Sequence, residues 1–383
     1  MAADAQGQVV VAAIERLWTT RNAKVRPRES RLLVWRSEDQ GRSWSPPFAL
    51  HQSPEFGMTQ ADPWLQSTGR GEFAIVFMAA SRDRPDLPGA VFQRSADGGK
   101  TWTKPHAFHR WVDKTVLAVS PSGKELAVAF TTFDPDKGRG VGVHRSPDKG
   151  KTWQELPATF AAPTKTYTAQ GMVLSDQGAI AIAWKEARGG PGSETFRHAI
   201  TTTIDGGHDW KTKEFAAVPY HLADELQLTG PALSLDDAGR LLAVSIPPND
   251  SDGRFSVLLR WSKDFQTWSD PMRLADGQGV EYRGYPAVAA SGRRIHVAWM
   301  ERKDKKYHVW YRGSADSGQT WSDRLLLSRP DHASDALTPD GFPEPGGHYM
   351  SLADDGTGLV HAVWGVQHQA RGEIWHSTIR WVD

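Results

Sequence analysis

The sequence predicts an all-β fold built from repeated four-stranded units, and three observations lead to this prediction. The 383 residues include 17 Trp, 36 Gly and 24 Pro, a composition typical of many short strands joined by tight turns. Apolar runs are short and alternate at period two, as in EFAIVFM (72 to 78) and RIHVAW (294 to 299), and long helical periodicity is absent. One turn-like motif also recurs along the chain at a nearly constant spacing.

The recurring motif reads Ser-x-Asp-x-Gly-x-Thr-Trp and occurs six times. Its final tryptophans are 58, 51, 57, 58 and 53 residues apart, about the length of one four-stranded unit. We expect the Asp to accept hydrogen bonds from amides of its own turn, the Gly to take a positive φ and the Trp to pack against neighbouring strands. The copies are SEDQGRSW (37 to 44), SADGGKTW (95 to 102), SPDKGKTW (146 to 153), TIDGGHDW (203 to 210), SKDFQTW (262 to 268) and SADSGQTW (314 to 321).

Each unit is predicted to contain four strands, A to D, with the motif between C and D. The template unit places A near 62 to 66, B near 72 to 79, C near 90 to 95 and D near 102 to 108. Units with the same order begin near Lys114, Thr168, Leu228 and Arg283.

Charge and composition exclude several function classes. Lys plus Arg (45) equals Asp plus Glu (45), so there is no basic surface signal for nucleic acid. No apolar run reaches 18 residues, so no membrane span is predicted. The absence of Cys excludes disulfides, thiolate nucleophiles and cysteine zinc sites. There is no P-loop, HExxH, G-x-S-x-G or EF-hand loop, so neither a cofactor nor a metal is predicted.

The first residues, Met1 to Ala5, are interpreted as an initiator methionine placed on a mature exported protein. This interpretation predicts a secreted or periplasmic protein and leaves a cytoplasmic one open. The sequence gives no sign of an oligomer, and a monomer is expected.

The recurring motif is the Asp-box, and the whole chain resembles the sialidase-like, Asp-box (BNR-repeat) family of β-propellers. The resemblance implies one β-propeller domain over residues 1 to 383, with the ring closed between N- and C-terminal strands. The motif is specific for the fold and weakly specific for activity, because such propellers include sialidases, other glycan-acting enzymes and proteins without catalysis.

The two ends of the chain give incomplete units. The first shows B (8 to 18), C (30 to 37) and D but no A, while the last (347 to 383) shows A, B and C but no D. Five full units plus a closing strand would give the six blades of a sialidase. Because ADAQGQVVVAAI (3 to 14) looks like an A-to-B turn, we favour seven blades, with the first trimmed within strand A.

The resemblance places the motif turns on one face and the B-to-C and D-to-A loops around a central site on the other. Sialidase chemistry uses three arginines on a substrate carboxylate, a Tyr nucleophile activated by a Glu, and a protonated Asp. By position in the repeat, we predict Tyr349, Glu301 and Asp62 as catalytic residues. The predicted substrate-binding residues are Arg283, Arg82, Arg188, Tyr282 and His348. The long loop from 328 to 349 is the predicted lid.

The sequence departs from the sialidase pattern in three places. The segment from Gln60 to Pro63 has no arginine where a first sialidase blade would carry one. The inner strand at 228 to 231 lacks the family's Glu, and the loop from 246 to 254 has no arginine directly after its strand.

Each candidate also has a structural interpretation. The arginines, together with Arg302 and Arg371, could be solvated loop charges, and Glu186 and Glu301 could be partners of neighbouring basic residues. For Arg283, we expect a side chain near the central site, so that Arg283→Ala would change the free energy of unfolding by no more than about 0.5 kcal/mol.

Three functions remain open. The first is an exo-glycosidase that hydrolyses a terminal acidic sugar. The second is a non-catalytic propeller that binds a glycan or a protein partner. The third is a polysaccharide lyase that uses a Tyr/His pair such as Tyr349 with His348, or Tyr220 with His221.

Overall fold

The structure is a computed structural model, and it describes residues 1–17, 29–50, 59–80, 89–108, 112–134, 138–157, 166–188, 195–219, 230–247, 255–276, 280, 282–304, 306–329, 350–368 and 371–381. These residues form 27 β-strands, and no helix among them could span a membrane. The strands group into seven antiparallel blades, six of four strands and a last one of three. The prediction of an all-β, seven-bladed β-propeller fold is confirmed.

Contacts divide the chain into two compact units. The first comprises Met1–Ile180 with Thr203–Trp210, and the second comprises Ala181–Thr202 with Lys211–Asp383. The first three blades belong to the first unit and the last three to the second, while the fourth blade contributes to both.

The first two blades share one sheet. Its strands are β1 (Ala2–Ala3), β2 (Val9–Leu17), β3 (Glu29–Ser37), β4 (Phe48–Ala49), β5 (Thr59–Gly69), β6 (Glu72–Ala80), β7 (Ala90–Ser95) and β8 (His106–Ala107). The two blades meet at one parallel pair, Ser30 opposite Thr59. Buried Gln60 fastens this junction, because its carbonyl accepts from Ser30 Oγ at 2.6 Å and its Oε1 accepts from the Leu32 amide at 2.7 Å.

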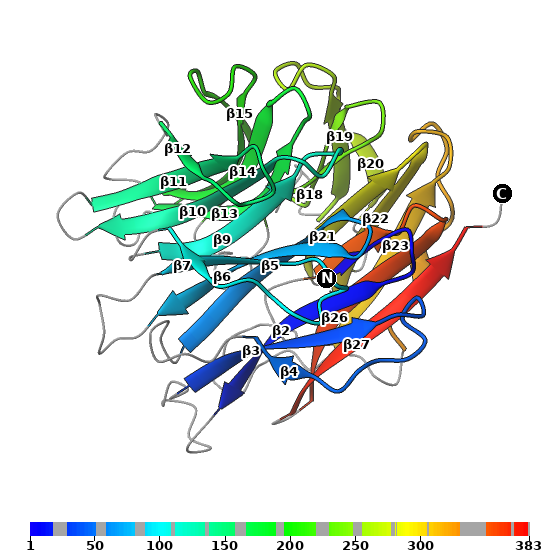
Figure 1. Cartoon of the computed structure of the whole chain (residues 1–383). Helices are drawn as coiled ribbons and strands as arrows, with labels where there is room; N and C mark the ends of the chain where they lie inside the picture. Colours follow the sequence, from blue (N-terminus) through cyan, green and yellow to red (C-terminus); the bar gives the residue numbers. More distant parts are fainter. Residues whose placement is uncertain are drawn as a thin grey trace. The chain divides into compact units, whose positions relative to one another are not determined.

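The third and fourth blades are separate four-stranded sheets (Figure 1). The third consists of β9 (Val112–Val119), β10 (Leu126–Asp134), β11 (Gly138–Ser146) and β12 (Gln154–Leu156). The fourth consists of β13 (Thr166–Leu174), β14 (Ile180–Arg188), β15 (Thr195–Thr203) and β16 (Lys211–Pro219).

The remaining blades repeat this order up to the last strand. The fifth has β17 (Ala232–Leu235), β18 (Leu241–Ser245), β19 (Val257–Ser262) and β20 (Met272–Ala275). The sixth has β21 (Tyr282–Ser291), β22 (Arg294–Lys303), β23 (Lys306–Ser314) and β24 (Leu325–Leu326). The seventh has β25 (Met350–Asp354), β26 (Leu359–His368) and β27 (Arg371–Arg380).

The structure agrees with the expectation of a first blade trimmed within strand A. Its inner strand is the two-residue β1, whose Ala2 and Ala3 pair with Val10 and Val9. Two residues are too few to show a period-two pattern, so the signal for this strand was the A-to-B turn that follows it. In the described part of the last blade there is no fourth strand, as the sequence predicts.

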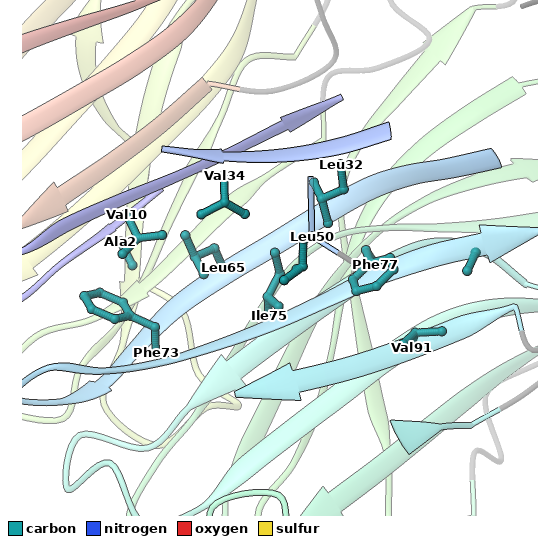
Figure 2. Packing of buried hydrophobic residues seen from close by; sticks show 11 residues of the cluster. Ala2, Val10, Leu32, Val34, Leu50, Leu65, Phe73, Ile75, Phe77 and Val91 are labelled. Carbon is teal, nitrogen blue, oxygen red and sulfur yellow. The ribbon is translucent and has the colours of Figure 1, made fainter. Parts of the chain in front are cut away.

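Apolar side chains from successive blades pack together between the sheets. Figure 2 shows this for the first two blades, where Leu32 and Val34 of β3 face Leu65 and Ile75 of β5 and β6. All four are at most 5% exposed. The alternation along β3 and β6 that predicts strands therefore also produces the seam between blades.

The six motif turns, which we call the repeat turns, make the hydrogen bonds that their sequence predicts. In the second copy, Ser95 Oγ donates to Asp97 Oδ1 at 2.8 Å, and the Thr101 amide and hydroxyl donate to the same carboxylate at 2.9 and 2.6 Å. Hydrogen bonds of this kind, first those from Thr152, lower the pKa of Asp148 to about 2. The residue after the Asp has a positive φ in every copy, from Gln40 at 63° to Ser317 at 62°.

The fifth repeat turn is one residue shorter than the others. Thr267 donates to Asp264 from three residues away, whereas Thr101 donates to Asp97 from four. Phe265 takes the left-handed conformation there, with φ 63°, and no glycine follows it. The carboxylate therefore holds the turn even where the usual glycine is missing.

Candidate functional site

The structure brings two pairs of chemically functional side chains to the blade ends opposite the repeat turns. In each antiparallel blade, the C-to-D turn lies at one end of the sheet, and the start of strand A lies with the end of strand B at the other end. One pair lies in the first unit, at the starts of β5 and β9. The other lies in the second unit, at the start of β21 and the end of β22.

Three inner strands carry a β-bulge near their start, and each bulge holds a non-glycine residue at positive φ. These residues are Asp62 (47°), Lys114 (51°) and Tyr285 (52°). The register shifts lie at the same place in each blade, beside buried Phe77, Phe130 and Trp299 of the neighbouring B strand. A left-handed non-glycine residue costs about 1–3 kcal/mol, and bulges of this kind redirect side chains beside functional sites. The three strained positions therefore mark this end of the blades.

The first pair joins two of these bulges. Lys114 Nζ donates to Asp62 Oδ1 at 3.1 Å, and Thr115 Oγ1 donates to the Asp62 backbone carbonyl at 2.9 Å. The Asp62 and Lys114 side chains are 11% and 10% exposed. Partial removal from water strengthens their attraction.

The second pair is an ion pair between Arg283 and Glu301, which lie opposite each other on β21 and β22. Arg283 Nε donates to Glu301 Oε2 at 2.8 Å, and Arg283 Nη1 donates to the Phe255 carbonyl at 2.9 Å. The two residues are 1% and 5% exposed. Our expectation that Arg283→Ala would leave stability unchanged is therefore wrong, because the guanidinium is buried and paired.

Glu301 Oε2 also accepts from two further groups. Trp299 Nε1 donates to it at 3.3 Å, and Arg324 Nη1 lies 3.5 Å away. The Arg324 guanidinium lies over the Trp310 ring, 4.4 Å from its centre. One carboxylate oxygen thus gathers two guanidinium groups and an indole, so a substrate would reach Arg283 only by displacing these contacts.

The structure describes the other predicted residues only in part. Arg188 ends β14 and Tyr282 begins β21, and only their backbones are described. Arg82, His348 and Tyr349 lie outside the described residues, as does all but the start of the predicted lid. For these five residues the assigned roles stay predictions.

Sequence reasoning missed three residues at this end. Lys114, Thr115 and Tyr285 were not singled out, because nothing in the sequence announces a bulge without glycine. The available signal was positional: Asp62, Lys114 and Tyr285 all fall at the start of an inner strand of the repeat. Among the described residues, no group of three or more His, Asp or Glu side chains could hold a metal ion.

Comparisons with known proteins agree with the fold. Residues 4–190 match the model of the BNR repeat-like domain. The protein "Sialidase" of Bacteroides fragilis (strain YCH46) is 25% identical over 193 residues, which cover 47% of this chain and 34% of that protein. The chain thus spans about a third of the length of this relative.

Solved structures resemble the chain over most of its length. The Hadza microbial sialidase Hz136 has a TM-score of 0.52 at 14% identity, covering 88% of this chain and 70% of that one. A protein of unknown function from Dyadobacter fermentans DSM 18053 has 0.52 at 16%, covering 80% and 91%. A PL25 ulvan lyase has 0.51 at 10%, covering 98% and 92%. At such identities the likeness shows the fold alone.

The blades and the repeat turns define a β-propeller. Its residues 4–190 are similar to the BNR repeat-like domain, and the chain resembles sialidases, as its sequence predicts.

Proposed function

We propose that this protein acts on glycans, as an exo-glycosidase that hydrolyses a terminal acidic sugar. The observation that carries the proposal is the set of strained bulges at one end of the blades, which hold Asp62, Lys114 and Tyr285. Strained backbone that the surrounding strands hold in place is typical of functional sites. The sialidase among the curated relatives and the sialidase and ulvan lyase among the solved structures support a glycan as the substrate class.

In this proposal, the sugar carboxylate is bound by Arg82 and Arg188, with Tyr282 and His348 beside it. The Tyr349 oxygen bonds to the anomeric carbon as the glycosidic C–O bond breaks, its phenolic proton passes through water to the leaving oxygen, and a second water then releases the sugar from Tyr349. Arg283 is less suited to the carboxylate, because Glu301 already neutralises it. Glu301, similarly, is less available to activate Tyr349.

The test is a substrate panel with matched variants. The wild type is incubated with fluorogenic α-sialosides, β-glucuronides and related acidic glycosides, and release of the fluorophore is followed. We expect turnover on one substrate class, and a loss of at least about a hundredfold in Tyr349→Phe. Asp97→Asn, which alters the second repeat turn, serves as a control and should keep its activity.

Other outcomes separate the alternatives. Ultraviolet absorbance from an unsaturated sugar, without fluorophore release, would favour a lyase. The lyase alternative is motivated by the ulvan lyase structure, whose match covers 98% of this chain. Saturable binding of a glycan without any turnover would favour a non-catalytic propeller. Full activity in Tyr349→Phe would contradict the proposed nucleophile.

A further inference from the structure

We propose that Lys114 is a positioning residue that holds Asp62 as an ionised hydrogen-bond acceptor for sugar hydroxyl groups. The inference rests on the proposed function, because it assigns a role within the same glycan site. It changes the role first expected for Asp62, which was that of a protonated acid.

The first step of the argument is the contact itself. Lys114 Nζ lies 3.1 Å from Asp62 Oδ1, and both side chains are about nine-tenths buried. An ammonium group at this distance in a partly desolvated place favours the charged carboxylate over the neutral acid. A carboxyl group held in this way is suited to accept hydrogen bonds, and poorly suited to donate a proton to a leaving group.

The second step concerns the backbone. Asp62 and Lys114 lie on inner strands of adjacent blades, and both take a left-handed conformation that L-residues disfavour. Thr115 Oγ1 adds a hydrogen bond to the Asp62 carbonyl at 2.9 Å, so β9 holds both the side chain and the main chain of Asp62. Asp62 and Lys114 are both strained and contact each other, and Thr115 fixes the backbone of Asp62. This arrangement indicates that the Asp62 carboxylate is held in position for a function.

The third step concerns the class of ligand group. The pair carries no net charge, so it has no electrostatic preference for a substrate carboxylate. A carboxylate beside an ammonium group offers an acceptor and donors side by side, which matches neighbouring sugar hydroxyls, each both donor and acceptor. The pair is therefore assigned to the hydroxyl-bearing part of the sugar, and any acidic substituent must be bound elsewhere.

Four variants test this assignment: Lys114→Met, Lys114→Arg, Asp62→Asn and the double variant with Asp62→Asn and Lys114→Met. Lys149→Met is the control, because it breaks the more exposed pair of Lys149 with Glu72 in the first unit, with side chains 35% and 34% exposed. The double variant removes both charges of the pair together, so it should fold even where Lys114→Met alone is destabilised.

The functional readout is the affinity for N-acetylneuraminic acid, glucuronic acid and rhamnose, measured by calorimetry over a range of pH. For the sugar that binds, Asp62→Asn and Lys114→Met should each weaken binding about ten- to a hundredfold, and Lys114→Arg should restore most of it. In Lys114→Met the loss of affinity on acidification should begin at a higher pH, because the carboxylate has lost its adjacent positive charge. Lys149→Met should behave as the wild type.

A second readout does not depend on any ligand. Carboxyl carbon NMR of the aspartates follows the titration of Asp62 in the wild type and in Lys114→Met. An Asp62 titration at the same pH in both proteins, or one near neutrality in the wild type, would overturn the positioning role. If no sugar binds while the titration moves as expected, the proposed function fails and the pairing stands. Unchanged affinity in all four variants would remove the pair from the site.

Discussion

At the residue scale, the fate of Arg283 shows how burial changes the meaning of a charged side chain. The sequence places it at the start of an inner strand, where an arginine could face a substrate. In the structure its guanidinium is 1% exposed and is shared between Glu301 and the carbonyl of Phe255. Because both side chains have lost their contact with water, each buried charge now depends on the other for its stabilisation.

Removing one half of this pair should be costly. We expect Arg283→Met to lower the free energy of unfolding by about 3–5 kcal/mol, because buried Glu301 then loses its buried guanidinium partner and keeps the more exposed Arg324 at 3.5 Å. Urea denaturation measures the change. Arg31→Met, which breaks a pair with Glu15 that is more than a third exposed, should cost less than about 1 kcal/mol. An equal loss of unfolding free energy in the two variants would contradict this distinction between the buried and the exposed ion pair.

At the element scale, the β26–β27 hairpin contains a buried histidine, His361, in hydrogen-bond contact with a partly buried one, His376. His361 Nδ1 and His376 Nε2 are 3.0 Å apart, and their rings are stacked with centres 5.3 Å apart. Burial lowers the pKa of His376 to about 4, with a smaller contribution from His361, and burial also lowers the pKa of His361. Asp355, whose Oδ2 lies 3.9 Å from His361 Nε2, and Asp354 oppose the shift of His361.

The hairpin should make the protein less stable in mild acid. Unfolded histidine has a pKa near about 6.5, whereas folded His376 stays neutral down to a pH of about 4, so the unfolded state binds more protons between these values. The contribution of His376 to the free energy of unfolding is complete above the pKa of the unfolded state. It falls by about 2 kcal/mol as the pH drops toward 4. Urea unfolding at pH 7, 5.5 and 4.5 should show this decline, and His376→Gln should show a shallower one. Parallel curves would refute it.

At the scale of the whole molecule, the seven blades differ most at the chain end, where the last blade has three described strands. Its place next to the sixth blade is held by Trp381, whose Nε1 donates to Tyr311 Oη at 2.6 Å. Tyr311 Oη lies 2.7 Å from His296 Nδ1, and His296 Nε2 lies 3.0 Å from Asp354 Oδ2. Because Tyr311 Oη accepts from the indole, the Tyr311 hydroxyl donates to His296 Nδ1, and His296 Nε2–H donates to Asp354 Oδ2.

Gly313 makes room for this indole, since a Cβ there would come within 2.1 Å of Trp381 Cζ2. Trp381→Phe should cost about 1 kcal/mol through the lost donor, and Trp381→Ala about 3 kcal/mol through the cavity. Gly313→Ala should destabilise the wild type more than it destabilises Trp381→Ala, where the clash with the indole is gone and the contact with Tyr311 Oη at 2.5 Å remains. Thermal unfolding of the four proteins forms a double-mutant cycle, and strict additivity would show that Trp381 does not hold the blade.

Much of this fold could be read from the sequence because its signals are local. The repeat turns combine a hydroxyl, a carboxylate and a positive-φ residue within five positions, and the B strands alternate over enough residues to be recognised. Strand β1 carries no periodicity in its two residues, and only the turn after it indicated that the first blade begins within strand A. The bulges were missed because Asp62, Lys114 and Tyr285 take a conformation that their side chains disfavour, which only the packing of neighbouring strands imposes.

The sequence by itself determined the place of each repeat turn and favoured seven blades over six, since both follow from spacing along the chain. Only the tertiary structure decided that Lys114 meets Asp62 across 52 positions and that Glu301 takes Arg283 out of solvent. The physical reason is that the ionic state and role of a charged side chain depend on its partners and its exposure to water, and both are set by residues distant in the chain.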